Sequence, residues 1–265
     1  MEDVMEWEVT EQDVVEREVM ELGVMDRARV DQVEFRSRGQ SNKEYWFKWR
    51  RNRITASVAH YIARSRFANG RSRAPPASYL ALITGEGPGV KTRAMTWGID
   101  NEARAIRQYK LETAMLGRKV WVQKCGLFID PQNPWLGASP DGIVMNRRRG
   151  QRLRVLEVYC PYKHRHSSVA DACRVNRDFC LEIQKGSGRP VYRLKPKHRY
   201  FTQVQVQMAV TGLPQADFVV FTLKETVIVQ VDFDAEWWEE TLPKLDRFYR
   251  EAVLQKGLRP KMQDP

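Results

Sequence analysis

Two acidic residues on either side of a short polar turn have the clearest potential for chemistry in this sequence. Asp141 opens one β-branched run and Glu157 lies near the end of the next, so the stretch favours a β-hairpin. If the hairpin folds about Arg149, Asp141 lies opposite Glu157 and Ile143 opposite Val155, with Cβ atoms roughly 4.5–5.5 Å apart. Two carboxylates placed in this way can bind one hard divalent cation such as Mg²⁺. A turn Asp and a solvated strand Glu explain the spacing equally well.

A third carboxylate, Glu102, lies on a helix predicted for residues 92–116, which we expect to be interrupted near Trp97 and Gly98. The helical repeat places Glu102, Ile106 and Tyr109 on one face, so this carboxylate has apolar neighbours. Spacing alone favours an ordinary surface Glu on a charged helix.

The other elements must hold these residues in place, and their patterns predict an α/β domain. Helices are expected at residues 42–51, 54–62, 77–84, 167–174, 198–211 and 234–255, the second of them capped by Thr55 or Ser57. Strands are expected at residues 120–129 and, in a closing hairpin, at 216–223 and 226–233. Residues 175–197 are interrupted by Gly and Pro and are predicted to be irregular. The helix at 198–211 carries Tyr200, Gln203 and Gln207 on one side.

The charge of the chain is divided unevenly. Residues 1–34 contain twelve Asp or Glu and three Arg, whereas residues 35–265 contain 41 Lys or Arg and 21 Asp or Glu. A body this basic indicates a polyanionic partner, most simply nucleic acid; a merely soluble basic domain is the lesser alternative.

Composition also indicates the number of domains and the cellular environment. The length of 265 residues suits one domain with a full core. Four cysteines indicate a reducing, intracellular environment, which would be the nucleus in a eukaryote. No apolar run approaches the roughly 18–20 residues of a membrane span, and no secretory leader opens the chain, so no membrane partner is expected.

The first thirty residues contain a five-residue repeat. Valine recurs from Val4 to Val24 at this period, and an acidic residue recurs from Glu6 to Asp31. A period of five matches neither a helix nor a strand. We therefore expect a disordered, low-complexity acidic tail at residues 1–41 and one folded domain at residues 42–265.

Several ordered motifs resemble one family of nucleases. Gly-Ala-Ser-Pro-Asp141-Gly, followed by Leu-Glu157-Val-Tyr-Cys-Pro-Tyr, is similar to the lambda exonuclease and YqaJ-like viral recombinase (alkaline exonuclease) branch of the PD-(D/E)XK nucleases. Four further blocks agree with it in type and order, namely Trp46 with Arg50 and Ile-Thr-Ala-Ser57, Trp97-Gly-Ile-Asp-Asn-Glu102, Arg165, and Tyr200-Phe-Thr-Gln203-Val-Gln. The resemblance covers roughly residues 42–250, and it implies a restriction-endonuclease-like core with a central mixed β-sheet flanked by helices.

The resemblance also implies roles for individual residues. Asp141, Glu157 and the Val158 carbonyl would bind Mg²⁺, or Mn²⁺ in its place; Glu102 would hold water and Gln203 would orient groups at the site. A 5′-phosphate at a duplex end would be captured by Arg50, Ser57, Ser139 and Arg165. The activity implied is 5′-to-3′ hydrolysis of one strand of linear duplex DNA in recombination and repair. A single-strand-annealing protein and further copies of the chain would be partners.

Tyr159 departs from this family pattern, because it stands where the motif has Lys. A Lys at that position supplies a cation, and a comparable electrostatic donor raises the rate by a factor on the order of 10²–10³. A phenol supplies no positive charge. The chain is then an inactive pseudo-nuclease that binds DNA ends, or it keeps weak metal-driven activity, or a displaced Lys such as Lys163 or Lys195 reaches the site.

Two further alternatives belong to other classes. A zinc module could be built from Cys160, His164, His166, Cys173 and Cys180, although the spacing matches no standard finger. A non-catalytic DNA-binding scaffold would instead use the arginines at 147–149 and the loop at 185–199.

Overall fold

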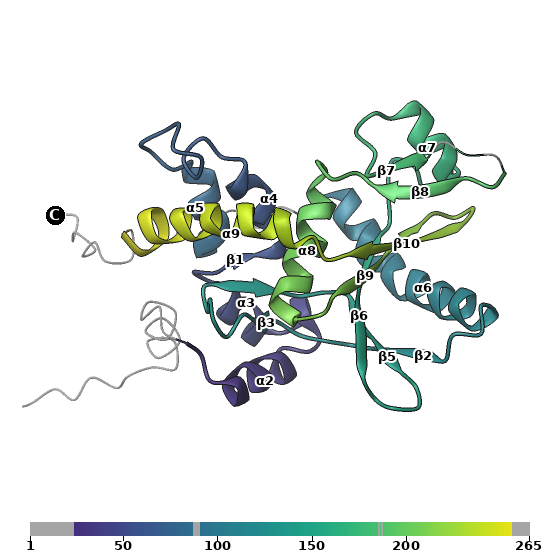
Figure 1. The fold of residues 1–265 in the computed structure, drawn as a ribbon, viewed down its shortest axis with the longest axis horizontal. Coiled ribbons are helices and arrows are strands. Elements are labelled where there is room, and N and C mark those ends of the chain that lie inside the picture. Colours follow the sequence, from purple (N-terminus) through teal and green to yellow (C-terminus); the bar gives the residue numbers. More distant parts are fainter. Residues whose placement is uncertain (1–23, 87–90, 185, 187, 256–265) are drawn as a thin grey trace, which may run out of the picture.

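A five-stranded mixed sheet forms the centre of the structure, a computed structural model that describes residues 24–86, 91–184, 186 and 188–255 (Figure 1). In spatial order the strands are β10 (Thr226–Asp232), β9 (Gln215–Phe221), β6 (Arg152–Tyr159), β5 (Gly142–Asn146) and β2 (Val120–Gln123). The pair β6–β9 is parallel and the other neighbours are antiparallel. The predicted central mixed sheet is confirmed, as is the closing hairpin of β9 and β10.

The hairpin of β5 and β6 has the predicted register at the end that matters for chemistry. Ile143 pairs with Val155 and Gly142 with Leu156, so Asp141 lies opposite Glu157 just beyond the last pair. The register shifts by one residue only on the turn side of Val144. The shift therefore leaves the two carboxylates facing each other.

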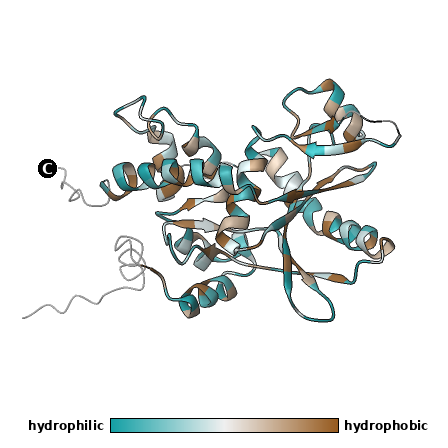
Figure 2. Cartoon of the chain, in the orientation of Figure 1, coloured by the Kyte–Doolittle hydropathy of each residue, from teal (hydrophilic) through white to brown (hydrophobic). Residues whose placement is uncertain are grey.

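Two helices cover opposite faces of this sheet. The main core lies between α8 (Arg199–Thr211) and the sheet face that carries Ile143 and Val155. A smaller apolar cluster lies on the other face, against α6 (Arg93–Met115). Because successive strand residues point to opposite faces, Glu157 shares the α8 face with Val155. The hydropathy colours show the hydrophobic residues gathered on the central strands and polar ones at the tip of the β5–β6 hairpin (Figure 2).

A second, three-stranded sheet corrects one sequence prediction. The expected strand at residues 120–129 is two strands, β2 and β3 (Phe128–Ile129), which belong to different sheets. The second sheet has the order β1 (Ile54–Thr55), β4 (Leu136–Ala138), β3. The break falls near Gly126, where an added Cβ would lie 2.1 Å from the Glu34 backbone oxygen.

The N-terminal helix α2 (Arg27–Arg36) also corrects the predicted domain boundary. Val33 of α2 is fully buried, and the Glu34 carboxylate accepts a hydrogen bond of 2.9 Å from the Gly126 amide. The Ser37 hydroxyl accepts another, of 2.8 Å, from the Leu127 amide. Residues 24–41 are thus part of the folded body. Residues 1–23, which contain most of the repeat, lie outside the described residues.

The remaining elements surround these sheets (Figure 1). The helix α4 packs against α8, and α9 follows β10. The helices in this group are η1 (Gln40–Asn42), α3 (Glu44–Arg50), α4 (Ala56–Ala63), α5 (Ala77–Thr84), α9 (Ala235–Phe248) and the π-helix η2 (Tyr249–Leu254). The segment predicted to be irregular contains a hairpin of β7 (Leu181–Gln184) and β8 (Val191–Leu194), preceded by α7 (Val169–Val175).

One prediction about helices was wrong, and another was right in position only. The helix α6 is continuous through Trp97 and Gly98, and the side-chain Nδ2 of Asn101 donates to the Trp97 carbonyl. Thr55 stands at the cap position of α4 but makes no side-chain capping bond. Among the described residues, no helix has the length and apolar character needed to span a membrane.

Candidate active site

Four of the five predicted catalytic residues, all except Tyr159, line one cavity of about 250 Å³. We call it the carboxylate cavity, and its walls are Ser57, Gly98, Glu102, Asp141, Glu157, Val158, Arg199, Tyr200 and Gln203. The residues come from the start of α4, the residue before β5, the end of β6, the first half of α6 and the start of α8. Gly98 has open space where a side chain would begin. A glycine inside a helix weakens it by roughly 0.5–1 kcal/mol relative to Ala, and at this position it leaves the cavity open.

Glu157 is buried and fully hydrogen-bonded from α8. Gln203 Nε2 donates to its Oε1 at 2.5 Å and Gln207 Nε2 donates to its Oε2 at 2.7 Å. The two Gln residues are four apart and therefore project from one helix face. Gln203 was predicted as a site residue. Gln207 was placed on the same side but given no role, and the Gln-x-x-x-Gln spacing was the signal for it.

Asp141 is fixed by the strand beside it. Its Oδ2 accepts a 2.7 Å hydrogen bond from the backbone amide of Val158. Pro140 precedes Asp141 and restricts the backbone before β5. Val158, the third expected ligand through its carbonyl, thus lies directly beside Asp141, as the hairpin register requires.

The electrostatics of the cavity favour a bound cation. Burial raises the pKa of Glu102, Asp141 and Glu157, and repulsion between carboxylates adds to the rise for Asp141 and Glu157. For Glu157 the pKa reaches about 8, although the hydrogen bond from Gln207 lowers it. Buried like charges of this kind need protons or a counter-ion.

Carboxylate oxygens are the ligands that Mg²⁺ prefers, so the donor set of Asp141 and Glu157 fits a hard divalent cation. Within the described part of the chain, no three His, Cys, Asp or Glu side chains converge closely enough to form a ready-made metal cluster. The fit therefore rests on the facing pair and the Val158 backbone, with Glu102 on a separate wall of the cavity.

Tyr159 is a packing residue at the end of β6. Its ring centroid lies 4.6 Å from that of Tyr200 and 6.4 Å from that of Phe179. Burial raises the pKa of its phenol to about 12, so the side chain is neutral. Tyr159 thus fills space beside the cavity and brings no positive charge to it.

Arg199 is the cation that the structure places in the wall of the carboxylate cavity. It is exposed, it lies over the Tyr200 ring at 5.0 Å, and it donates a long hydrogen bond of 3.4 Å to the Tyr61 hydroxyl. Neither lysine considered from the sequence lines the cavity: Lys163 is exposed, and Lys195 Nζ donates to the Arg177 carbonyl at 2.7 Å. Sequence reasoning missed Arg199, whose only signal was its position beside the Tyr/Gln motif.

Three of the four predicted phosphate-binding residues form a connected line beside the cavity. Arg50 Nη2 donates to the Thr55 hydroxyl at 3.3 Å, which lies 3.2 Å from the Ser57 hydroxyl. Arg50 also lies 4.1 Å from the Trp46 ring, whose indole N–H donates to the Ser139 hydroxyl at 2.9 Å. Burial lowers the pKa of Arg50 to about 10. These side chains are ordered donors for an anion at the cavity edge.

Arg165 lies in a different setting from the other three. Its Nη1 donates to the Tyr162 carbonyl at 2.7 Å, and its guanidinium lies 4.3 Å from the Tyr162 ring and 6.0 Å from the Trp97 ring. Trp97 directly precedes Gly98, which lines the cavity. Arg165 therefore lies on the α6 side of the site, apart from Arg50.

The structure gives no support to the zinc module. Cys160 and Cys180 are buried as free thiols, and burial raises the pKa of each to about 12. His164 is held by Asn176 at 3.1 Å and packs on Phe179. Among the residues that the structure describes, no three His, Cys, Asp or Glu side chains come together as a zinc site would require.

A comparison with known protein families agrees with this geometry. Residues 45–214 match the YqaJ-like viral recombinase domain. The chain belongs to this family. This YqaJ-like chain is 27% identical over 235 residues to the alkaline nuclease of Autographa californica nuclear polyhedrosis virus, with 84% of the chain and 51% of the viral protein covered. It therefore spans about half the length of that relative.

Solved structures show the same fold. The YqaJ-like chain is similar to the alkaline exonuclease LHK-Exo from Laribacter hongkongensis, with a TM-score of 0.57, 24% identity, and 81% of this chain and 94% of that chain covered. It is also similar to SOX in a DNA complex, with a TM-score of 0.57, 12% identity, and coverage of 85% and 71%. A third similar structure is the SOX protein of KSHV in an RNA complex, with a TM-score of 0.52, 10% identity, and 85% of this chain and 74% of that chain covered. The predicted restriction-endonuclease-like class is confirmed.

Proposed function

We propose that this chain is a nuclease that hydrolyses phosphodiester bonds of linear duplex DNA with Mg²⁺ or Mn²⁺. The observation that carries the proposal is the meeting of Asp141, Glu157, Glu102 and Gln203 in one cavity. Membership of the YqaJ-like family and similarity to a protein named alkaline nuclease support it.

The cavity residues divide the work of hydrolysis among them. Asp141, Glu157 and the Val158 carbonyl would hold the cation, which when bound lowers the pKa of a water and neutralises negative charge on the reacting phosphate. Gln203 and Gln207 keep the Glu157 carboxylate in one orientation by donating to both of its oxygens. Glu102 would orient the attacking water and take its proton.

The substrate would enter by its 5′ end. Arg50, Ser57 and Ser139 would hold a terminal 5′-phosphate, with Arg165 on the opposite side of the site, since arginine donates two parallel hydrogen bonds to phosphate. Binding the 5′ end gives digestion in the 5′-to-3′ direction. The single strand that remains would serve recombination and repair inside the cell, in the nucleus of a eukaryote. A single-strand-annealing protein and further copies of the chain would be partners.

Arg199 would supply the positive charge that Tyr159 does not. A cation aimed at charge that develops in the transition state lowers the barrier more in a partly desolvated site than in water. Arg199 lines the cavity together with all three carboxylates. Its exposure and its long hydrogen bond to Tyr61 leave it room to turn toward the phosphate.

The decisive experiment compares wild type with Asp141→Asn on 5′-phosphorylated linear duplex DNA in Mg²⁺. Wild type should shorten the duplex from its 5′ ends, and Asp141→Asn should abolish shortening while it still binds DNA. Label on the 5′ or the 3′ end reports the direction, and a 5′-hydroxyl duplex tests the need for the phosphate. Wild-type binding without any shortening at high enzyme concentration would instead establish the pseudo-nuclease, which the Tyr159 replacement favours.

A further inference from the structure

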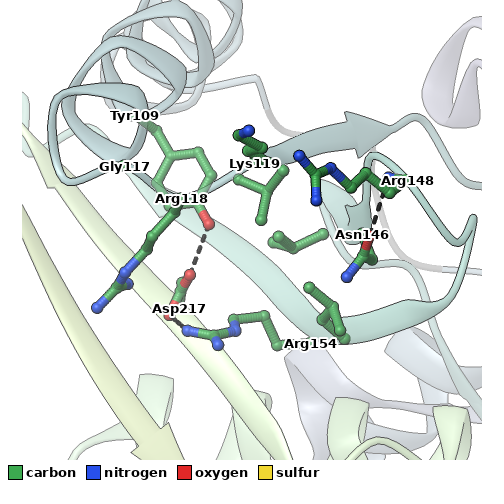
Figure 3. Close-up of a pocket in the computed structure, with 11 residues that line it drawn as sticks. Tyr109, Gly117, Arg118, Lys119, Asn146, Arg148, Arg154 and Asp217 are labelled. Atoms are coloured by element: carbon green, nitrogen blue, oxygen red, sulfur yellow. Dashed lines mark hydrogen bonds and ion pairs between the residues drawn. The ribbon is translucent and has the colours of Figure 1, made fainter.

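A second cavity, of about 450 Å³, lies on the other side of the sheet from Glu157 (Figure 3). We call it the basic pocket, and its lining residues are Tyr109, Gly117, Arg118, Lys119, Val120, Val144, Asn146, Arg148, Leu153, Arg154 and Asp217. It lies between the end of α6, the start of β2, the turn end of the β5–β6 hairpin and Asp217 of β9. The three carboxylates of the carboxylate cavity and the predicted phosphate-binding residues do not line it.

The pocket has more positive charge than its own acid can balance. Its one carboxylate, Asp217, is buried and is already engaged by Arg154 at 3.1 Å and by the Tyr109 hydroxyl (Figure 3). In the part of the chain that the structure describes, no carboxylate pairs with Arg118, Lys119 or Arg148. Three cations are thus left around one polar cavity.

Arg154 has a donor left over. Its Nη1 reaches Asp217 and, at 3.4 Å, Gln230, but its Nε is buried without a hydrogen-bond partner. A buried donor that stays unpaired is unfavourable, so an anion held by Arg154 would supply an acceptor that the guanidinium lacks.

The backbone holds these cations in place. The Asn146 side chain accepts hydrogen bonds from the amides of Arg148 and Arg149 at 2.9 and 3.0 Å, which fixes the hairpin turn. The Arg147 amide donates to the Lys119 carbonyl at 2.9 Å and ties that turn to the start of β2. The charges therefore belong to a built site and not to a freely moving loop.

We propose that the basic pocket binds a backbone phosphate of nucleic acid, at a contact separate from the carboxylate cavity. Arginine forks match phosphate oxygens, and Asn146 and Tyr109 give the pocket polar walls. The occupant is a polyanion because the positive charge continues outward along the exposed turn at residues 147–149. The contact would hold the duplex while its end is processed, so it adds to the proposed function but can be measured without it.

The test uses the full chain with Arg118→Gln and Arg148→Gln combined, against a control with Arg107→Gln and Lys110→Gln. Both pairs remove two exposed charges without carboxylate partners, and the control residues lie on α6 outside the pocket. Affinity for a fluorescent 30-base-pair duplex is measured in EDTA from ~50 to ~200 mM salt. The pocket variant should bind about tenfold or more weakly, and its log–log salt slope should fall by about one, since one phosphate contact contributes about 0.9. The control should match wild type.

Two results would overturn the proposal. Equal weakening in both variants would mean that only total charge matters. Unchanged duplex binding in the pocket variant, together with loss of thermal protection by thymidine 5′-monophosphate, would identify a site for free mononucleotides. Because no cation or cleavage is needed, a wild type that fails to cut DNA refutes the proposed nuclease and leaves this comparison readable. Equal unfolding temperatures show that both variants fold.

Discussion

Replacing Arg199 tests whether this chain has moved the motif cation to a new position. We expect Arg199→Gln to slow cleavage of duplex DNA and Arg199→Lys to keep most of the rate, because only the charge is needed. Tyr159→Lys in the Arg199→Gln background should restore the rate, because residue 159 lies on the same strand face as Glu157.

The size of the effect follows from the setting of Arg199. A preorganised electrostatic donor contributes about 10²–10³ in rate, which is about 3–4 kcal/mol of barrier. Arg199 is exposed and is held by one long hydrogen bond, of 3.4 Å, so solvent screening and side-chain motion reduce its contribution. We therefore expect Arg199→Gln to lower the single-turnover rate by roughly 10–10²-fold.

The assay is single-turnover cleavage of 5′-labelled duplex at saturating enzyme, so that weaker binding does not enter the rate. Unfolding temperature and duplex affinity in EDTA serve as controls. A wild-type rate in Arg199→Gln would refute the reasoning. So would a loss that neither Arg199→Lys nor Tyr159→Lys repairs, because that pattern indicates a structural role for Arg199.

Three other predictions concern stability, and each is measured by chemical denaturation. Burial, and then the nearby charge of Arg199, lower the pKa of His198 from 6.5 to about 4, and its neutral Nδ1 accepts a hydrogen bond from the Tyr200 amide at the start of α8. The free energy of unfolding should therefore fall as the pH is lowered from 6.5 toward 4. The fall should be smaller in His198→Asn, which keeps a hydrogen-bond acceptor that does not titrate. Asp217→Asn should cost about 3 kcal/mol, since it leaves the Arg154 guanidinium without its buried counter-charge; a loss below ~1 kcal/mol would contradict this. Gly126→Ala should cost about 1–3 kcal/mol by displacing α2, whereas Gly98→Ala should stabilise by roughly 0.5–1 kcal/mol.

Local patterns were enough to predict the elements that carry the chemistry. The hairpin, α8 and the closing strands each have a clear period, and the alternation together with a turn centred on Arg149 places Asp141 opposite Glu157. The motif order along the chain indicated the fold, and residues 45–214 do match the YqaJ-like family. The roles assigned to the site residues remain predictions.

The features that the sequence did not predict all depend on tertiary packing. The strand at 120–129 is broken because α2, far away in sequence, packs against Gly126. The acidic character of the first residues concealed α2, whose few apolar side chains are buried only by the rest of the domain. The β7–β8 strands are short and lie between Gly and Pro residues, so they have no readable period of their own. Arg199 and the basic pocket likewise depend on segments that meet only in the fold.

The most direct test of the central claim is a crystal structure with Mn²⁺ and a 5′-phosphorylated duplex, with anomalous scattering used to locate the metal. Asp141 and Glu157 should both ligate a Mn²⁺ ion, with the Val158 carbonyl as a further ligand and the terminal phosphate beside Arg50. An anomalous peak elsewhere on the chain, or none between the two carboxylates at saturating Mn²⁺, would contradict the account.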